Sequence, residues 1–179
     1  MCIRDSFDAL RLEIVSRTAE GDAIVEIARI RARMEEELAR ETTTRRNFKT
    51  GRGGVLDVES IVQALQLTHG AKHPELLAVT TTEAHLTQLE RMGALSPDQA
   101  TVLRDGWAFL QRLASRLRIV DNRSISDLDQ ERGDLEGLAL RLGYTSPRRE
   151  GGARRALLAD YERHTDAIRA EYERVFQNV

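Results

Sequence analysis

The residues of this sequence best suited to chemistry lie in a glycine-rich turn that leads into an apolar segment. Residues 49–67 read KTGRGGVLDVESIVQALQL. Backbone N–H groups at a helix N-terminus bind anions, and glycines there let a ligand approach closely. Two neighbouring basic side chains would add positive charge, the arginine with bidentate reach. The turn is therefore a candidate phosphate-facing site, made of Lys49, Gly51, Arg52, Gly53 and Gly54.

Two carboxylates complicate this interpretation. Asp57 and Glu59 follow the glycines within about one helical turn, and they would repel a phosphate unless a metal ion or the basic pair intervened. They are candidate carboxylates that support the site. The alternative is purely structural: the glycines permit a tight entry, and Asp57 complements the helix dipole. The pattern is neither a Walker loop nor a dinucleotide fingerprint, and residue chemistry alone favours the structural alternative.

Other reactive residues give weaker signals. His69 and His73 are four apart, but Gly70 and Pro74 deny them a shared helix face, so no metal site is predicted. No nucleophile elbow, Cys/His pair or zinc spacing occurs. His85 and His164 are expected on the surface or packed, and Trp107 and Phe109 in the core. A strip of arginines is expected to be a solvated face, with an acidic partner as the alternative; it consists of Arg112, Arg116, Arg118 and Arg123.

The element that must position the turn is a helix beginning near Val55. Its apolar residues cover most of the circumference, which is typical of a buried, central helix. They are Leu56, Val58, Ile61, Ala64, Leu65 and Leu67. Glu59, Gln63 and Gln66 share one stripe, and any that are buried must find partners.

The rest of the chain shows helical periodicity. A short helix is predicted from Phe7 to about Glu20 and a longer one from Ala23, with Arg29, Arg31 and Arg33 on its outside. Its apolar marks are Ile24, Ile27, Ile30, Met34 and Leu38. Thr81 or Thr82 caps a further helix, and Ser96-Pro97 begins another. The segment from Asp121 to Asp129 is predicted to be irregular. A short helix ends at Gly143, and the last runs through Leu157, Tyr161, Thr165, Ile168, Tyr172, Val175 and Val179.

No strand pattern appears, so the prediction is an all-α bundle of about seven helices around the central one. The 179 residues are 41% hydrophobic and 31% charged, with a net charge of −2. This balance gives no support for binding nucleic acid or anionic membranes, and no run is long enough to span a bilayer. The lone Cys2 agrees with a cytoplasmic location. Residues 1–6, MCIRDS, are not a signal peptide and are expected to be artefactual or disordered.

The glycine turn and its helix carry a family resemblance. The stretch NFKTGRGGVLDVESIVQALQLTHG resembles the segment that follows each nucleotidyltransferase domain in the glutamine synthetase adenylyltransferase/deadenylase family. The matching positions are Lys49, Gly51, Gly53, Gly54, Asp57, Val58, Glu59, Gln63, Leu65 and Leu67, and Pro74-Glu75-Leu76 follows at the expected place. Ser60 departs from the family's aromatic residue. PII uridylyltransferases have a similar turn, but Arg52 and the Asp-Val-Glu run favour the adenylyltransferase.

The resemblance implies a helical domain, residues 47–179, that docks on a nucleotidyltransferase domain of the same polypeptide, with residues 7–46 as lead-in helices. The parent enzyme attaches AMP from ATP to a tyrosine of glutamine synthetase, using Mg²⁺, removes it by phosphorolysis, and responds to the PII protein. The family's catalytic Gly-Ser and Asp-x-Asp motif is absent here. An inactive fragment, expected from the C-terminal half and without bound cofactor, is therefore predicted. In it Lys49 and Arg52 would meet phosphates, and Glu59 would orient a ligand or a metal-bound water.

Two alternatives remain open at this stage. The chain would be a non-catalytic helical interaction module if its partner docked on the arginine strip or on the face around Trp107. It would instead be the equivalent domain of a PII uridylyltransferase if the turn's resemblance to that family were the meaningful one.

Overall fold

Helices make up nearly all of the regular structure in the part of the chain that the computed structural model describes, residues 22–121, 125–145 and 151–177. The elements are α2 (Asp22–Met34), a π-helical turn η1 (Glu35–Ala39), β1 (Arg45–Asn47), α3 (Val55–His69), α4 (Glu75–Ala78), α5 (Thr82–Arg91), α6 (Pro97–Asp121), β2 (Asp127–Asp129), α7 (Leu135–Arg141) and α8 (Gly152–Phe176). The all-α prediction is confirmed. The predicted helix from Phe7 to Glu20 and the segment 1–6 lie outside the described residues.

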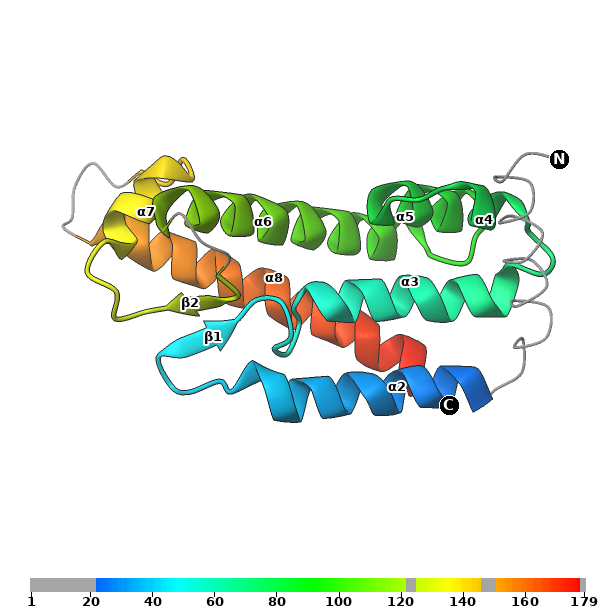
Figure 1. The fold of residues 1–179 in the computed structure, drawn as a ribbon. Coiled ribbons are helices and arrows are strands. Elements are labelled where there is room, and N and C mark those ends of the chain that lie inside the picture. Colours follow the sequence, from blue (N-terminus) through cyan, green and yellow to red (C-terminus); the bar gives the residue numbers. More distant parts are fainter. Residues whose placement is uncertain (1–21, 122–124, 146–150, 178–179) are drawn as a thin grey trace, which may run out of the picture.

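Three helical layers are visible in Figure 1: α5 and α6 along one side, α3 in the middle and α2 on the other side. Helix α8 runs obliquely across them and packs against α6, α7, α3 and α2. Among the described residues, none of the helices combines the length and the apolar character needed to cross a membrane.

Helix α3 supplies the middle of the core, as its apolar circumference predicts. It buries Val58, Ile61, Val62 and Ala64, while Gln63 is exposed. Its stripe of polar residues is only partly covered. Gln66, which belongs to this stripe, forms a hydrogen bond with His85, and the two Nε2 atoms are 2.6 Å apart. Burial of the apolar side chains of α3 contributes about 25 cal/mol per Å² of apolar area to stability.

The predicted helix starts are also observed. The Thr81 hydroxyl accepts a hydrogen bond from the Ala84 N–H and caps α5. At the start of α6, Ser96 and Gln99 exchange hydrogen bonds: the Gln99 N–H donates to Ser96 Oγ, and the Ser96 N–H donates to Gln99 Oε1. This reciprocal pair satisfies two N–H groups that the helix leaves without partners. In α8, the predicted inward face is buried at Leu157, Tyr161, Thr165, Ile168 and Tyr172.

The absence of strands was predicted wrongly. β1 and β2 form a two-stranded antiparallel sheet in which Arg46 is opposite Leu128. Of the two strands, β2 lies within the segment Asp121–Asp129 that was predicted to be irregular. The Phe48 N–H donates to Ser126 O at 2.9 Å and extends the pairing towards the glycine turn. Strands of three residues are too short to show alternation of apolar and polar residues, so periodicity could not reveal them.

The orientation of α2 also differs from the prediction. Arg31 was placed on the outside but is only 2% exposed, whereas Ile30 is 46% and Leu38 52% exposed. Arg31 shares a helical stripe with Ile27 and Met34, at spacings of four and three residues, so the inward face passes through it. Leu38 lies in the π-helical turn, where the wider spacing shifts the register of the side chains.

Candidate functional site

The glycine turn is folded back on the segment that precedes it. Asn47 Oδ1 accepts hydrogen bonds from the N–H groups of Lys49 and Thr50, at 3.0 and 2.9 Å. The Gly51 N–H donates to Asn47 O at 2.8 Å, and the Val55 N–H donates to Phe48 O at 3.0 Å. Because Asn47 ends β1, the small sheet fixes where the turn begins.

Glycine is required in the turn by close approach of other backbone. Gly53 has φ of 68°, and a Cβ atom placed there would lie 1.9 Å from the carbonyl oxygen of Thr165 in α8. A Cβ atom on Gly51 would lie 2.3 Å from Asn47 O. These glycines therefore let the turn pack directly against α8 and β1.

A buried ion pair closes the turn from inside. Asp57 is 0% exposed, and its Oδ1 atom accepts a hydrogen bond from Arg31 Nε at 2.5 Å. Its Oδ2 atom accepts one from the Gly53 N–H at 2.8 Å. Arg31 Nη2 also donates to Gly51 O at 2.7 Å. Burial raises the pKa of the Asp57 carboxyl, and the Arg31 guanidinium and the Gly53 N–H act in the opposite direction.

The ion pair extends into a charge network that joins α2, α8 and the glycine turn. Arg169 Nη1 lies 2.9 Å from Glu35 Oε2 and 3.4 Å from Asp57 Oδ2. Arg169 Nε donates to Glu173 Oε1 at 2.9 Å, and the same oxygen lies 3.2 Å from Arg52 Nη2. The network consists of Arg31, Glu35, Arg52, Asp57, Arg169 and Glu173. It holds the turn in one shape and places the Arg52 side chain on the outside of α8.

The predicted site residues are thus divided between two roles. The N–H groups of Gly51, Gly53 and Gly54 all donate within the chain, so these glycines shape the turn. Two side chains of the turn consequently remain candidates to contact a phosphate. Lys49 is half-buried, and Arg52 is exposed.

Mg²⁺ does not fit at this turn. Asp57 Oδ1 and Oδ2 already face two guanidinium groups and an N–H group. Within the described ranges, no group of three or more His, Cys, Asp or Glu side chains is arranged to hold a metal ion. Asp57 therefore acts by hydrogen bonding and charge pairing.

Glu59 is the second predicted carboxylate, and it does not join the charge network. Its side chain is half-buried, burial raises its pKa, and no described residue hydrogen-bonds to it. The folded state therefore binds a proton more readily than the unfolded chain, and the ionised side chain opposes folding above the folded-state pKa. We expect Glu59→Gln to raise the thermal midpoint slightly at neutral pH. The difference should disappear as the pH falls below the unfolded pKa of about 4.3, which thermal unfolding at several pH values will show.

Sequence reasoning missed the residues that hold the turn from other helices. Arg31 could have been found from its place on the stripe of Ile27 and Met34. Arg169 gives no such signal, because it lies between the buried positions Ile168 and Tyr172 on a helix rich in charge. Its guanidinium carbon lies 4.9 Å from the centre of the Tyr172 ring, a cation–π contact that only the fold reveals.

The other sequence candidates lie away from the turn. His164 stacks on Phe109 with ring centres 4.7 Å apart, and His85 is buried, so both are packed residues. Of the arginine strip, Arg112, Arg116 and Arg118 are exposed on α6, and Arg123 lies outside the described residues. His73 Nδ1 lies 3.1 Å from Glu75 Oε1.

Comparison with known proteins supports the resemblance seen in the turn. The chain is 35% identical over 172 residues to the bifunctional glutamine synthetase adenylyltransferase/adenylyl-removing enzyme of Leifsonia xyli, covering 95% of this chain and 16% of that protein. The protein of the same name from Streptomyces avermitilis is 35% identical over 162 residues, covering 88% of the chain and 16% of that protein. The protein of the same name from Nocardia farcinica is 35% identical over 156 residues, covering 87% of the chain and 15% of that protein. The chain thus spans 15–16% of the length of these curated relatives.

The family model described as GlnD PII-uridylyltransferase matches residues 28–176. The matched region runs from within α2 to the end of α8 and includes the glycine turn, both strands and all of the charge network. The chain therefore belongs to the GlnD PII-uridylyltransferase family.

Proposed function

We propose that this chain is a helical domain of a larger, bifunctional glutamine synthetase adenylyltransferase/adenylyl-removing enzyme. In that enzyme it supports the transfer of AMP between ATP and a tyrosine of glutamine synthetase. The observation that carries the proposal is the glycine turn, which is held by the buried pair Arg31–Asp57 and carries the exposed Arg52 side chain. The names of the three relatives supply the substrate.

The turn's contribution is positioning and charge. Its backbone is fixed by β1, α8 and the charge network, so Lys49 and Arg52 start from a preorganised loop. Preorganised cations stabilise the charge of a phosphoryl group without reorganising at the moment of reaction. The family's Gly-Ser and Asp-x-Asp catalytic motif, absent from this sequence, belongs in this proposal to a neighbouring nucleotidyltransferase domain, together with the sites for ATP and Mg²⁺.

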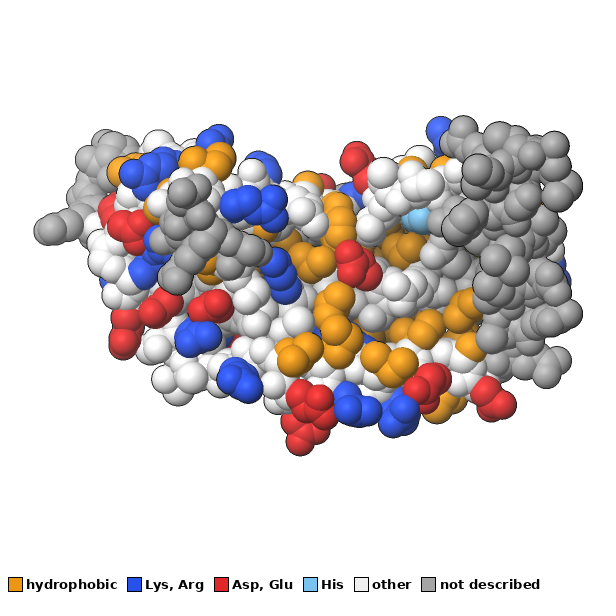
Figure 2. All heavy atoms as spheres, in the orientation of Figure 1, with side chains coloured by type: hydrophobic (Ala, Val, Ile, Leu, Met, Phe, Trp, Pro, Cys, Tyr) orange, Lys and Arg blue, Asp and Glu red, His pale blue; other side chains and the backbone are white. Residues whose placement is uncertain are grey.

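An exposed apolar surface supports docking of that neighbouring domain. In Figure 2, apolar side chains gather over the part of the molecule where Figure 1 shows α2 and α3. On α2, Val25 and Ile30 are each about half exposed. Large apolar patches on soluble proteins commonly mark interaction sites. The catalytic domain would cover this surface, with PII and glutamine synthetase as partners of the complete cytoplasmic enzyme.

A second candidate is the equivalent domain of a PII uridylyltransferase, because the matching family model carries that description. The two proposals differ in the nucleotide and in the protein modified. Incubating the complete enzyme with labelled ATP and glutamine synthetase, and with labelled UTP and PII, separates them by which protein becomes labelled.

Replacing the two basic side chains tests the role of the turn. In the complete enzyme, we expect Lys49→Ala and Arg52→Ala each to lower kcat/KM for AMP transfer about tenfold or more, because each removes a charge-assisted bond to phosphate. The thermal midpoint of Arg52→Ala should change little, since ion pairs of exposed side chains contribute at most about 1 kcal/mol.

Matched controls are available on the same fold. Arg33→Ala removes an arginine whose pair with Glu37 is exposed, and Lys72→Ala removes an exposed lysine of the loop after α3. Both should leave kcat/KM unchanged. Full activity of the Lys49 and Arg52 variants would reduce the turn to a structural element. The 179-residue chain alone should transfer no AMP.

A further inference from the structure

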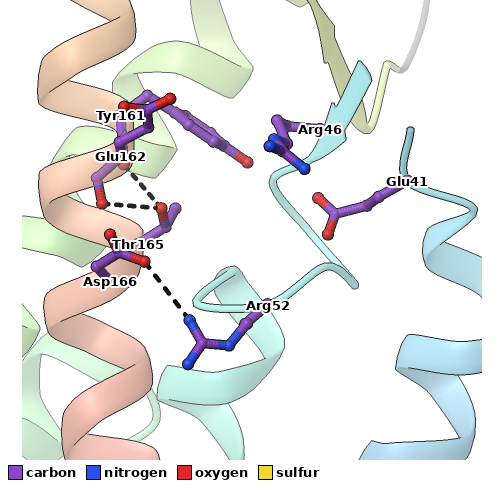
Figure 3. A pocket seen from close by; sticks show the side chains of 7 residues that line it. All are labelled: Glu41, Arg46, Arg52, Tyr161, Glu162, Thr165 and Asp166. Carbon is purple, nitrogen blue, oxygen red and sulfur yellow. Dashed lines mark hydrogen bonds and ion pairs between the residues drawn. The ribbon is translucent and has the colours of Figure 1, made fainter. Parts of the chain in front are cut away.

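A pocket of about 280 Å³ lies beside the glycine turn, and Arg52 of that turn lines it. Figure 3 shows that the segment around β1, the glycine turn and α8 each form part of its wall. The lining residues are Glu41, Arg46, Arg52, Tyr161, Glu162, Thr165 and Asp166. The side chains at its mouth are mostly charged, so the pocket suits a polar ligand.

Tyr161 is the residue that the fold alone does not explain. Its side chain is only 4% exposed, yet its hydroxyl points into the pocket towards Arg46 (Figure 3). No described residue hydrogen-bonds to this hydroxyl, and its oxygen is not one of the fully buried side-chain atoms, so it is accessible from the pocket. Burial and the nearby Glu41 carboxylate raise the pKa of Tyr161. The hydroxyl therefore keeps its proton at neutral pH and is able to donate it in a hydrogen bond.

Two arginines with spare donors face the same space. Each guanidinium carries five N–H donors. Arg46 uses Nη1 for a hydrogen bond to Thr42 O at 3.3 Å. Arg52 uses Nη2 for Glu173, and its Nη1 atom is 3.5 Å from Asp166 Oδ1. That last contact joins two exposed side chains at the limit of hydrogen-bond distance, so it contributes little.

Three carboxylates also line the pocket, and a bound anion would have to lie nearer to the two arginines than to them. Glu41 Oε1 accepts a hydrogen bond from the Asn47 N–H at 2.8 Å, which holds that side chain to the wall. Glu162 and Asp166 are exposed on α8, at the rim. An entering oxyanion would replace Asp166 as the acceptor for Arg52, while the Tyr161 hydroxyl and Arg46 would donate to it from the inner end.

We propose that this pocket binds a phosphoryl group, either as free phosphate or diphosphate or as the phosphate tail of a nucleotide. The Tyr161 hydroxyl, Arg46 and Arg52 are its donors. The inference shares Arg52 with the proposed function but does not depend on it, because binding is measured on the 179-residue chain without any transfer reaction.

Isothermal titration of the 179-residue chain with phosphate, diphosphate and ATP, without metal, tests the proposal. We expect diphosphate to bind and Tyr161→Phe to weaken it about tenfold, as loss of one hydrogen bond to a charged group predicts. Arg46→Gln should weaken it at least as much. Tyr144→Phe is the matched control, because the Tyr144 hydroxyl donates to Asp160 outside the pocket. The affinity of this variant for diphosphate should equal that of the unmodified chain. Circular dichroism confirms that each variant is folded.

The three ligands distinguish the sources of the phosphoryl group. Tighter binding of ATP than of diphosphate would assign the pocket to a nucleotide tail, and equal or weaker binding of ATP would assign it to a free oxyanion. Absence of binding by all three at millimolar concentration would overturn the proposal. So would diphosphate affinity that neither Tyr161→Phe nor Arg46→Gln changes. Neither result would affect the AMP-transfer measurements made on Lys49 and Arg52 in the complete enzyme.

Discussion

Replacement of Arg31 by methionine is expected to lower the free energy of unfolding by about 3–5 kcal/mol, the cost of breaking a buried ion pair by removing one partner. Methionine fills a similar volume but leaves the Asp57 carboxylate buried without its nearest cation, and it also frees Gly51 O. Urea unfolding followed by circular dichroism measures the difference.

The pH dependence of this loss identifies its cause. Without Arg31, the folded-state pKa of Asp57 rises further above the unfolded value of about 3.9. The folded protein then takes up a proton that the unfolded chain does not hold, which relieves the buried charge as the pH falls through the raised pKa. The deficit of the Arg31→Met variant should therefore shrink on acidification, and a deficit that stays constant with pH would contradict the charge-based explanation.

Two further variants complete the comparison. Arg33→Met removes an exposed arginine two residues away on α2, whose pair with Glu37 has an N–O distance of 3.3 Å; it should cost at most about 0.5 kcal/mol. The double variant Arg31→Met/Asp57→Leu removes both buried charges and should lose less than the sum of the two single variants.

Replacement of Gly53 by alanine is expected to cost about 2–5 kcal/mol. A non-glycine residue in the left-handed region loses roughly 1–2 kcal/mol, and overpacking adds about 1–3 kcal/mol. The new Cβ atom would lie 1.9 Å from Thr165 O, which is backbone of α8 and cannot rotate away. Relief requires the turn to separate from α8, so the loss should appear in thermal unfolding.

Gly93→Ala is the matched control. Gly93 has φ of 76°, close to that of Gly53, but no atom lies within 4 Å of a Cβ placed there. It should lose only the backbone penalty of roughly 1–2 kcal/mol. Equal losses for the two variants would show that close packing against α8 contributes nothing beyond conformation.

Much of the fold follows from local patterns that the sequence displays openly. The start of α6 at Pro97 and the buried face of α8 through Leu157 and Ile168 were predicted correctly, and Thr81 is the one of the two predicted cap residues that caps α5. Each depends on neighbours within a few positions, where hydrogen bonding and helical spacing are decided by the residues themselves.

The candidate site was less predictable because its contacts are long-range. Asp57 could be interpreted as an acid at a helix start, which is its usual role. Its partner Arg31 comes from another helix and Arg169 from near the end of the chain, and no spacing rule connects them. The Tyr161 hydroxyl was likewise hidden, since a tyrosine on a buried stripe predicts packing and not an open pocket at its tip.

The small sheet has a kinetic consequence for the site. It joins residues 45–47 to residues 127–129, with all of α3, α4, α5 and α6 between them in the chain. Bringing the two ends of so long a segment together costs conformational entropy. The hydrogen bonds between two strands of three residues give too little free energy to offset this cost. We therefore expect the two strands to pair after those helices have docked. The glycine turn is hydrogen-bonded to Asn47 at the end of β1, so we expect it to reach its final geometry late in folding.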